Sequence, residues 1–339
     1  MKKGRIAAVL AGLLFLTSCQ APDREVAGLA PPEEERLVVY TSHKEEVYGP
    51  IVKEFEDRTG LWVEVVTGGT NELLERIAAE GEEPQCDVMF GGGVESLQLY
   101  EDCFEPYTGA GAELLKPGLR PEGDRWTPFS SLPVVLIYNP RLVAPGRLRG
   151  WADLLDPEWR GKIAFADPAV SGSSYTAAVT MLSCLKGDIW EELARFEGNL
   201  DGNILEDSGD VVTAVDTGSC WVGVTLEETA LKRLGQGASI AIVYPAEGTS
   251  ALPDGTALIS GARHRDNAVE FLEFVQSEDV QALVVSDFAR RSVRTDVADR
   301  EELPREEEIG VIDYDTHWAS GLKEEFLERW ETGKGGEGG

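Results

Sequence analysis

The stretch LVVYTSHKEEVYGPIVKEFEDRTG, residues 37–60, joins a short β-type run to an amphipathic helical pattern. The run Leu37–Tyr40 consists of apolar and β-branched residues, and it stops at the polar Thr41-Ser42-His43. Apolar residues then recur at helical spacing until Gly60, a common helix terminator. The stretch therefore predicts a strand, a polar loop, and a helix that packs back on the strand. The apolar face of that helix comprises Val47, Ile51, Val52 and Phe55.

The same order of strand, loop and helix follows twice more. Residues 62–66 predict a second strand, followed by Gly68-Gly69-Thr70 and a helix over 71–80. A third strand is predicted at 87–90, and it ends in Gly91-Gly92-Gly93. This alternation is typical of a parallel sheet covered by helices. Ligands of such sheets bind at the carboxyl ends of the strands, so the three loops mark one predicted binding edge.

The rest of the chain repeats this alternation and predicts a second α/β unit. About 300 residues are more than one simple core usually holds, which favours two units. We expect the chain to leave the first unit, build the second and return to the first. Strands are expected at 133–138, 162–166, 221–224, 240–244 and 256–260, and helices at 175–185, 266–275 and 277–285.

The N-terminus has the pattern of an export signal. Three basic residues precede an apolar run over 6–16, which is too short to span a bilayer as a stable helix. The run ends in Leu16-Thr17-Ser18-Cys19, which resembles the bacterial lipoprotein signal. That resemblance implies cleavage before Cys19 and lipidation of its thiol; the alternative is an ordinary signal peptide with a chance cysteine. No other segment predicts a membrane span.

Charge and composition exclude several classes of partner. The net charge of −30 argues against nucleic acids and anionic membrane surfaces. It does not exclude an anionic ligand, because backbone amides can bind one locally. The sequence has no GxSxG elbow, Walker loop, HExxH or GxGxxG motif, so we expect no enzymatic activity.

Four of the five cysteines remain once Cys19 is assigned to lipid. An extracellular location permits disulfides, and four cysteines allow three pairings between which the sequence cannot choose. We take local pairing as the expectation, Cys86 with Cys103 and Cys184 with Cys220. There is no CxxC pair and no zinc spacing, so no metal or cofactor is expected.

Several stretches, in order along the chain, resemble the family 1 extracellular solute-binding proteins. The similarity is to the branch that includes ferric-ion-binding and phosphorylated-solute-binding proteins. The stretches cover nearly all of the predicted mature chain, and it is their joint order that carries the resemblance. They are residues 38–45, 51–60, 151–155 with 159–163, 171–173, 223–225, 244–249 and 266–274.

The resemblance implies a type II periplasmic-binding fold. In that fold two α/β lobes, each a mainly parallel sheet flanked by helices, are joined by two crossover strands that act as a hinge. The ligand binds in the cleft between the lobes. The implied division is a signal peptide at 1–18, a lipidated cysteine and flexible tether at 19–35, lobe 1 at 36–133 with 249–330, lobe 2 at 134–248, and a disordered tail at 331–339.

The segment Ser171-Gly172-Ser173-Ser174 precedes a predicted helix and is the main candidate for anion binding. Its hydroxyls, free backbone N–H groups and helix dipole would favour an anion. The alternative is a plain helix cap. The resemblance favours the anion, because relatives bind phosphate or a synergistic anion at this position. Ser42, Thr70, the close-approach glycine Gly92 and Thr225 complete the predicted donors.

The resemblance also raises iron as an alternative ligand. Ferric-ion binders of this branch use a histidine, a glutamate and two neighbouring tyrosines. His43 lies at the histidine position, but the glutamate position falls in Gly91-Gly92-Gly93 and the tyrosine pair falls at Glu227-Glu228. Without phenolates the set does not match the family's iron site, so iron is the second interpretation.

We therefore predict a monomeric, lipid-anchored binding protein that passes a small anionic organic solute to an ABC permease. The solute would be a sugar phosphate or a phosphonate. Glu227 or Glu228 would accept hydrogen bonds from its far end, although acidic residues also suit the first turn of a helix. For Arg290, Arg291 and Arg294 we expect interlobe or solvent-facing roles more than phosphate contacts. A third interpretation is the ligand-binding component of a membrane sensor.

Overall fold

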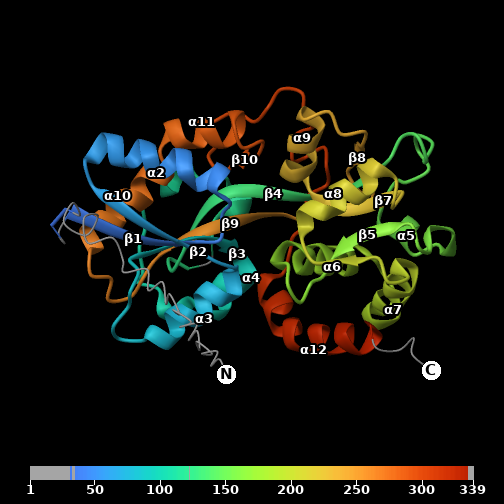
Figure 1. Ribbon diagram of the computed structural model, residues 1–339, viewed down its shortest axis with the longest axis horizontal. Coiled ribbons are helices and arrows are strands. Elements are labelled where there is room, and N and C mark those ends of the chain that lie inside the picture. The colour runs from blue at the N-terminus through green and yellow to red at the C-terminus, as the bar shows by residue number, and fades with distance from the viewer. Residues whose placement is uncertain (1–30, 33–34, 122, 335–339) are drawn as a thin grey trace, which may run out of the picture.

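The computed structural model describes residues 31–32, 35–121 and 123–334. These residues form two α/β lobes side by side, with the crossover strands running between them (Figure 1). The predicted signal peptide, Cys19 and most of the predicted tether lie outside the described residues. Within the described part of the chain, no helix combines the length and apolar character that a membrane span needs.

Lobe 1 has a mixed sheet built on the first three predicted strands. β1 (Arg36–Thr41) pairs in parallel with both β2 (Trp62–Thr67) and β3 (Val88–Gly93), and β9 (Ala251–Leu258) runs antiparallel to β3. Alternation along β1 sends Val39 to one core and Tyr40 to the other, so both faces are covered. The helices of the lobe are α2 (Glu45–Thr59), α3 (Thr70–Glu80), α4 (Val94–Leu99), α10 (Arg265–Val275) and α11 (Glu278–Ser286).

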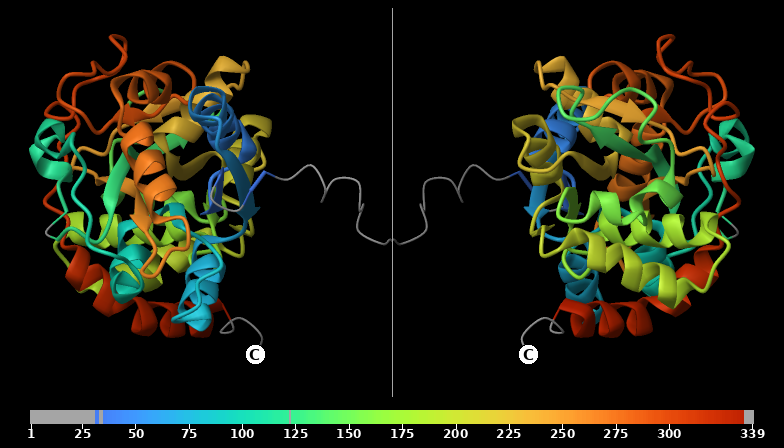
Figure 2. Two further views of the ribbon diagram at one scale, coloured as in Figure 1. Left: turned by 90° about the vertical axis from the view of Figure 1, so that its left-hand side faces the viewer. Right: turned by 90° about the vertical axis from the view of Figure 1, so that its right-hand side faces the viewer.

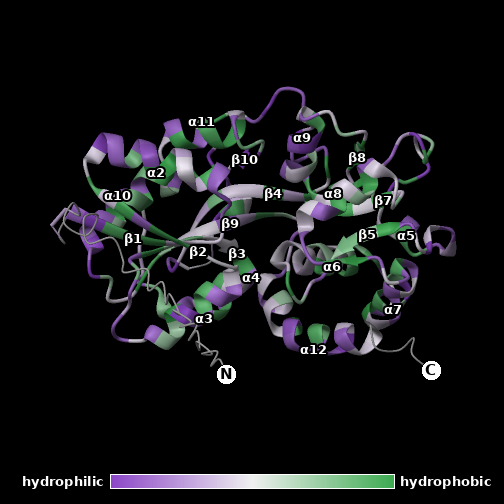
Figure 3. Ribbon diagram, viewed as in Figure 1, coloured by the Kyte–Doolittle hydropathy of each residue, from purple (hydrophilic) through white to green (hydrophobic). Residues whose placement is uncertain are grey.

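Lobe 2 repeats this design around the second half of β4 (Thr127–Tyr138). Its strand order is β4, β7 (Val222–Leu226), β5 (Ile163–Ala166) and β6 (Ile204–Leu205), and β8 (Ala241–Val243) also pairs with β4. Hydrophobic residues are concentrated in the strands, and the helices carry polar outer faces (Figure 3). The helices are α5 (Trp151–Leu154), α6 (Gly172–Cys184), α7 (Ile189–Leu200), α8 (Ser208–Thr217) and α9 (Glu227–Gly235).

Short elements complete the fold. The two-residue strand β10 (Arg291–Ser292) pairs antiparallel with Ser130 and Ser131 of β4. Single 3₁₀ turns are η2 (Glu101–Cys103), η3 (Ala112–Leu114), η4 (Pro117–Leu119) and η5 (Pro157–Trp159).

Two crossover segments join the lobes. Residues 127–133 of β4 pair with β9 in lobe 1, and residues 134–138 pair with β7 and β8 in lobe 2. At this change of sheet, the Val134 N–H donates to the Ser250 carbonyl at 3.0 Å, and the Thr249 hydroxyl donates to the Val134 carbonyl at 2.6 Å. The two crossovers are thus tied together where a hinge would bend. The α/β, two-lobed fold class is confirmed.

The C-terminal helix differs from the expected division. We expected residues up to 330 in lobe 1 and a disordered tail from 331, but α12 (Thr316–Lys334) packs in the core of lobe 2 and continues to residue 334. Its apolar face inserts Ala319, Leu322, Phe326 and Trp330 among the residues of α6 and α7. Figure 2 shows α12 along the lower edge of the molecule. The burial of two aromatic side chains explains why the chain crosses to this lobe.

The disulfide expectation is wrong, because all four cysteines within the described residues are free thiols. Cys184 packs on the face of the lobe 2 sheet that carries Val134, whereas Cys220 packs on the opposite face with Val135. The sheet therefore separates these two sulfurs. Cys86 and Cys103 share one apolar cluster without a bond.

Candidate functional site

A cavity of about 250 Å³ lies between the lobes, at the edge where the sequence predicts binding. Both lobes and the crossover strands contribute to it. Lobe 1 supplies Ser42, His43, Thr70, Gly92, Gly93, Glu95, Ser96 and Arg290; the crossover strands supply Leu132, Leu252, Pro253 and Asp254; lobe 2 supplies Gly172, Ser173, Tyr175, Thr176, Leu226 and Lys323.

Six of the predicted ligand residues line this cavity, and five do not. The six that line it are Ser42, His43, Thr70, Gly92, Gly172 and Ser173. Outside the lining are Ser171, Ser174, Thr225, Glu227 and Glu228. Thr225 is buried on β7 and paired with Val135, while the next residue, Leu226, faces the cavity. Strand alternation separates the two side chains.

The serines at the start of α6 have two different roles. The Ser171 hydroxyl caps the helix, accepting from the Ser174 N–H at 3.3 Å and from the Ser174 hydroxyl at 3.1 Å. Gly172 and Ser173 line the cavity, and the Ser173 hydroxyl also shares a hydrogen bond with the Ser171 hydroxyl at 3.0 Å. The N–H groups of Gly172 and Ser173 lie in the first turn, where no preceding helical carbonyl can accept them. This turn therefore offers backbone donors and one hydroxyl to a ligand.

His43 lies on the lobe 1 side of the cavity in an apolar setting. Its ring centroid is 4.6 Å from that of Phe90 and 5.4 Å from that of Phe129. Burial lowers the pKa of His43 to about 3, so the imidazole is neutral near pH 7. Its Nε2 lies 3.5 Å from Asp254 Oδ2 and has no hydrogen-bond partner among the described residues. The neutral ring can therefore form one hydrogen bond to a ligand through Nε2, but it carries no charge.

Two glycines allow the lobe 1 loops to pack together. Gly91 and Gly92 have φ angles of +103° and +113°. A Cβ at Gly91 would lie 2.8 Å from the Ser42 Oγ, and one at Gly92 would lie 3.0 Å from Thr70 Cγ2. The absence of a Cβ at these two glycines therefore lets the side chains of Ser42 and Thr70 pack closely against the backbone of this loop.

Asp254 and Arg290 form a buried ion pair beside His43. Arg290 Nη1 donates to Asp254 Oδ2 at 2.6 Å and to the Ser130 hydroxyl at 3.1 Å, while its Nε has no partner among the described residues. Asp254 was not among the residues predicted from the sequence. The aspartate lies on a crossover strand, Ala251–Leu258, where no local motif marks it.

Glu227 is a correction to the predicted site. Its carboxylate accepts two hydrogen bonds from Arg291, at 2.8 Å from Nε and 2.7 Å from Nη2, and a third from the Tyr244 hydroxyl. Both charged side chains are 1 % exposed. Because its oxygens are already bound, Glu227 is committed to joining α9 to β10 across the lobes. Arg291 accordingly has the interlobe role expected for it.

Glu228 is also engaged by cations. Its Oε2 lies 3.1 Å from the Lys232 ammonium and its Oε1 lies 4.0 Å from Arg290 Nη2. Lys232 in turn binds Glu46 of α2 at 3.0 Å, across the cleft. The first turn of α9 thus braces the lobes, although Glu228 Oε2 accepts no hydrogen bond among the described residues.

Glu95 and Lys323 are cavity residues that sequence analysis missed. Glu95 is buried, and its Oε1 accepts from the Thr176 hydroxyl of α6 at 2.8 Å and from the Tyr314 hydroxyl at 2.7 Å. The Thr176 contact joins the lobes, and both of its residues line the cavity. Arg294 does not line the cavity; it pairs with Asp296 and donates to the Gln276 carbonyl.

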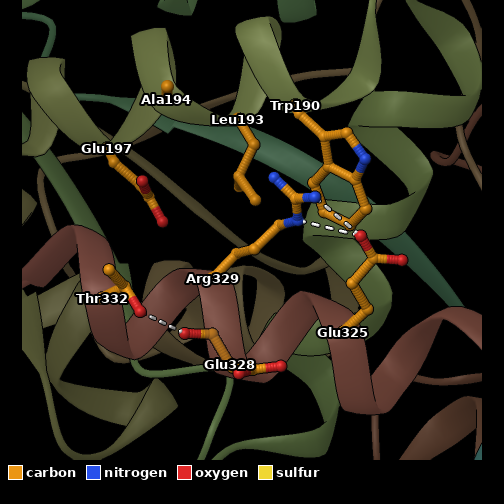
Figure 4. A pocket seen from close by; sticks show the side chains of 8 residues that line it. All are labelled: Trp190, Leu193, Ala194, Glu197, Glu325, Glu328, Arg329 and Thr332. Carbon is orange, nitrogen blue, oxygen red and sulfur yellow. Dashed lines mark hydrogen bonds and ion pairs between the residues drawn. The ribbon is translucent and has the colours of Figure 1, made fainter.

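Larger hollows occur elsewhere, but their chemistry differs. A groove of about 430 Å³ between α7 and α12 holds Arg329 over the Trp190 ring at 4.2 Å and against Glu325 at 2.8 Å (Figure 4). Another of about 800 Å³ lies behind β9 and also includes Leu252 and Pro253. The Arg329 guanidinium is satisfied within its groove, whereas the interlobe cavity contains buried polar atoms without partners. No group of three or more metal-ligating side chains occurs within the part of the chain that the structure describes.

The chain matches the model of the bacterial extracellular solute-binding protein family over residues 37–288. Iron uptake protein A1 of Synechocystis sp. is 26 % identical over 294 residues, covering 81 % of each chain. A probable ABC transporter periplasmic-binding protein, y4fP, of Sinorhizobium fredii is 27 % identical and covers 78 % of this chain and 76 % of its own. A putative 2-aminoethylphosphonate-binding periplasmic protein of Salmonella typhi is 24 % identical, covering 73 % and 74 %.

Solved structures share the fold. The periplasmic binding protein AfuA of Actinobacillus pleuropneumoniae, with fructose-6-phosphate bound, superposes with a TM-score of 0.78 at 23 % identity, covering 88 % of this chain and 98 % of that one. A two-component system protein that mediates signal transduction gives a TM-score of 0.76 at 26 % identity, covering 86 % and 98 %. The likeness to AfuA shows the fold alone.

Proposed function

This chain belongs to the bacterial extracellular solute-binding protein family, and we propose that it captures a small organic phosphate or phosphonate for an ABC importer. The observation that carries the proposal is the first turn of α6. Its cavity-facing N–H groups and the Ser173 hydroxyl are suited to the oxygens of a phosphoryl or phosphonyl group. The family comprises binding proteins rather than enzymes.

The charges in the cavity are compatible with an anion in spite of the acidic surface. Glu95 and Asp254 are balanced by Arg290 and Lys323 among the lining residues. A ligand anion would therefore meet a locally neutral cavity with oriented amides. A space of about 250 Å³ is below the 300–1,000 Å³ usual for drug-sized ligands, which favours a small solute.

Iron is the second candidate because an iron uptake protein is among the similar proteins. The residues favour it less. Glu227 and Glu228 stand where the family's tyrosine ligands would be, and both are held by cations. The segment Gly91-Gly92-Gly93 supplies no carboxylate. An anionic ferric chelate would still have the donors of α6 available, so ferric citrate is included in the test.

The test combines ligand screening by thermal shift with calorimetry on the soluble mature chain. We expect 2-aminoethylphosphonate or fructose 6-phosphate to stabilise the protein, and ferric chloride and ferric citrate to have no effect. Ser173→Ala should weaken binding about tenfold or more, because a hydrogen bond to a charged group contributes about 1.5–3 kcal/mol. Ser183→Ala, at the far end of the same helix, is the matched control and should bind normally. Stabilisation by iron alone, unchanged in Ser173→Ala, would refute the proposal.

We also propose export by residues 1–18 and anchoring through a lipid on Cys19, with an ABC permease as the membrane partner. The support is the lipoprotein-like sequence and the similarity to a probable ABC transporter protein. Cys19→Ala should release the protein from the membrane fraction. A Cys19→Ala protein that stays membrane-bound would exclude this anchor.

A sensor role is the alternative suggested by the two-component system structure. The same cavity would serve either task. Uptake of labelled solute by cells with and without the gene distinguishes them, since a sensor changes expression but carries no solute.

A further inference from the structure

The C-terminal helix α12 brings a lysine into the interlobe cavity. Lys323 lines the cavity together with Gly172 and Ser173 of α6. Its ammonium lies 5.5 Å from the centroid of the Tyr175 ring, which belongs to the first turn of α6. The family match ends at residue 288, so this lysine lies outside the matched segment. In Figure 1 the start of α12 lies close to α4 and α6.

The Lys323 ammonium has no carboxylate in direct contact. Its one hydrogen bond goes to the Ser96 hydroxyl at 3.1 Å, and Ser96 in turn donates to Asn71 Oδ1 at 3.1 Å. Among the described residues no carboxylate lies within 4.0 Å of the ammonium. An ammonium has three N–H donors, so two remain for a ligand. Burial lowers the pKa of Lys323, which is the expected sign for a partly desolvated cation without a close partner.

No nearby carboxylate forms an ion pair with Lys323. Glu95 acts on Lys323 only through longer-range electrostatics, and its Oε1 is already bound to Thr176 and Tyr314. Across the cavity, His43 Nε2 and Arg290 Nε are also without partners, and their side chains are only 5 % and 8 % exposed. Both atoms thus lack hydrogen-bond partners among the described residues, and both belong to side chains that line this cavity.

We propose that Lys323 is the charge partner of the ligand's phosphoryl or phosphonyl group, which makes α12 a part of the binding site. This inference rests on the proposed function. The anion would lie between the first turn of α6 and the ammonium of α12, so one ligand group would contact both helices. Binding would then depend on the packing of α12 in lobe 2, because that packing holds Lys323 in place.

The test is Lys323→Met, which keeps the length of the side chain and removes its charge. Calorimetry with 2-aminoethylphosphonate and with fructose 6-phosphate should show affinity at least tenfold lower than in the original protein. The melting temperature without ligand should be unchanged or higher, because a desolvated charge is removed. Lys53→Met on α2 makes the same change in net charge at a side chain that is 76 % exposed, and it should bind normally.

The outcomes separate this inference from the proposed function. If neither organic anion binds the original protein, the proposed function fails and Lys323 has no anion to pair with. If one binds and Lys323→Met binds it equally tightly, the proposed function stands and this inference is overturned. A large fall in the ligand-free melting temperature of both Lys323→Met and Lys323→Gln would also overturn it, by indicating a structural lysine. Should Lys323→Met not fold, Lys323→Gln, which remains polar toward Ser96, gives the same comparison.

Discussion

The first turns of α6 and α9 are both polar, but their polar groups are engaged differently in the structure. Both follow a strand of lobe 2 and both face lobe 1. In α6 the cap is internal to the turn, and Gly172 and Ser173 remain open to the cavity. In α9 the carboxylates of Glu227 and Glu228 are held by Arg291, Lys232 and Arg290. We therefore expect polar groups at a helix start to bind a ligand only where the protein has left them without other partners.

The largest expected effect is on α9. Glu227→Gln leaves Arg291 buried without a counter-charge, and removal of one partner of a buried pair costs about 3–5 kcal/mol. We expect a loss of this size in chemical denaturation, with ligand affinity of the folded protein nearly unchanged. Glu228→Gln is the control and should cost less, because its side chain is 12 % exposed and its closer cation, Lys232, also binds Glu46. If Glu227→Gln were fully stable but bound no ligand, Glu227 would be a ligand residue. The first turn of α9 would then bind ligand as the first turn of α6 is proposed to do.

A smaller effect is expected on α6. A methyl group at Gly172 meets no atom within 4 Å, so Gly172→Ala should leave stability unchanged or raise it by up to about 1 kcal/mol. The same methyl occupies part of the cavity lining and should weaken ligand binding several-fold. Thermal melting measures the change in stability, and calorimetry on the same preparation measures the change in ligand affinity. Reduced stability with normal binding would contradict the assignment of this turn to the ligand.

The smallest effect concerns the Glu46–Lys232 pair, which joins α2 to α9 at the rim of the cleft. The Glu46 side chain is 61 % exposed, so the pair is expected to contribute well under 1 kcal/mol. Glu46→Gln should therefore change ligand affinity by less than about threefold at low salt, and not at all at high salt. Lys53→Gln, which disrupts an exposed pair within α2, gives the background. If Glu46→Gln weakened ligand binding as much as Ser173→Ala, the main binding residues would lie at this rim and not on α6.

The site was predictable where its signal is local. Ser42, Thr70 and Gly92 follow strands or begin helices, and parallel strands bring such positions to one edge of a sheet. The start of the helix after Ser171 was predictable because small polar residues before a helical pattern mark an N-terminus. Thr225 was placed wrongly because a single register step turns a strand residue to the opposite face.

The sequence by itself determined the order of the elements, their apolar faces and the two-lobed fold, because these depend on periodicities a few residues long. The tertiary structure decided which polar groups are free. Arg291 neutralises Glu227 from 64 positions away, and Asp254 meets Arg290 from another part of the chain. It also carried α12 into lobe 2, which brings Lys323 beside α6. Burial and ion pairing arise between distant segments, so no local pattern records whether a charged side chain is already satisfied.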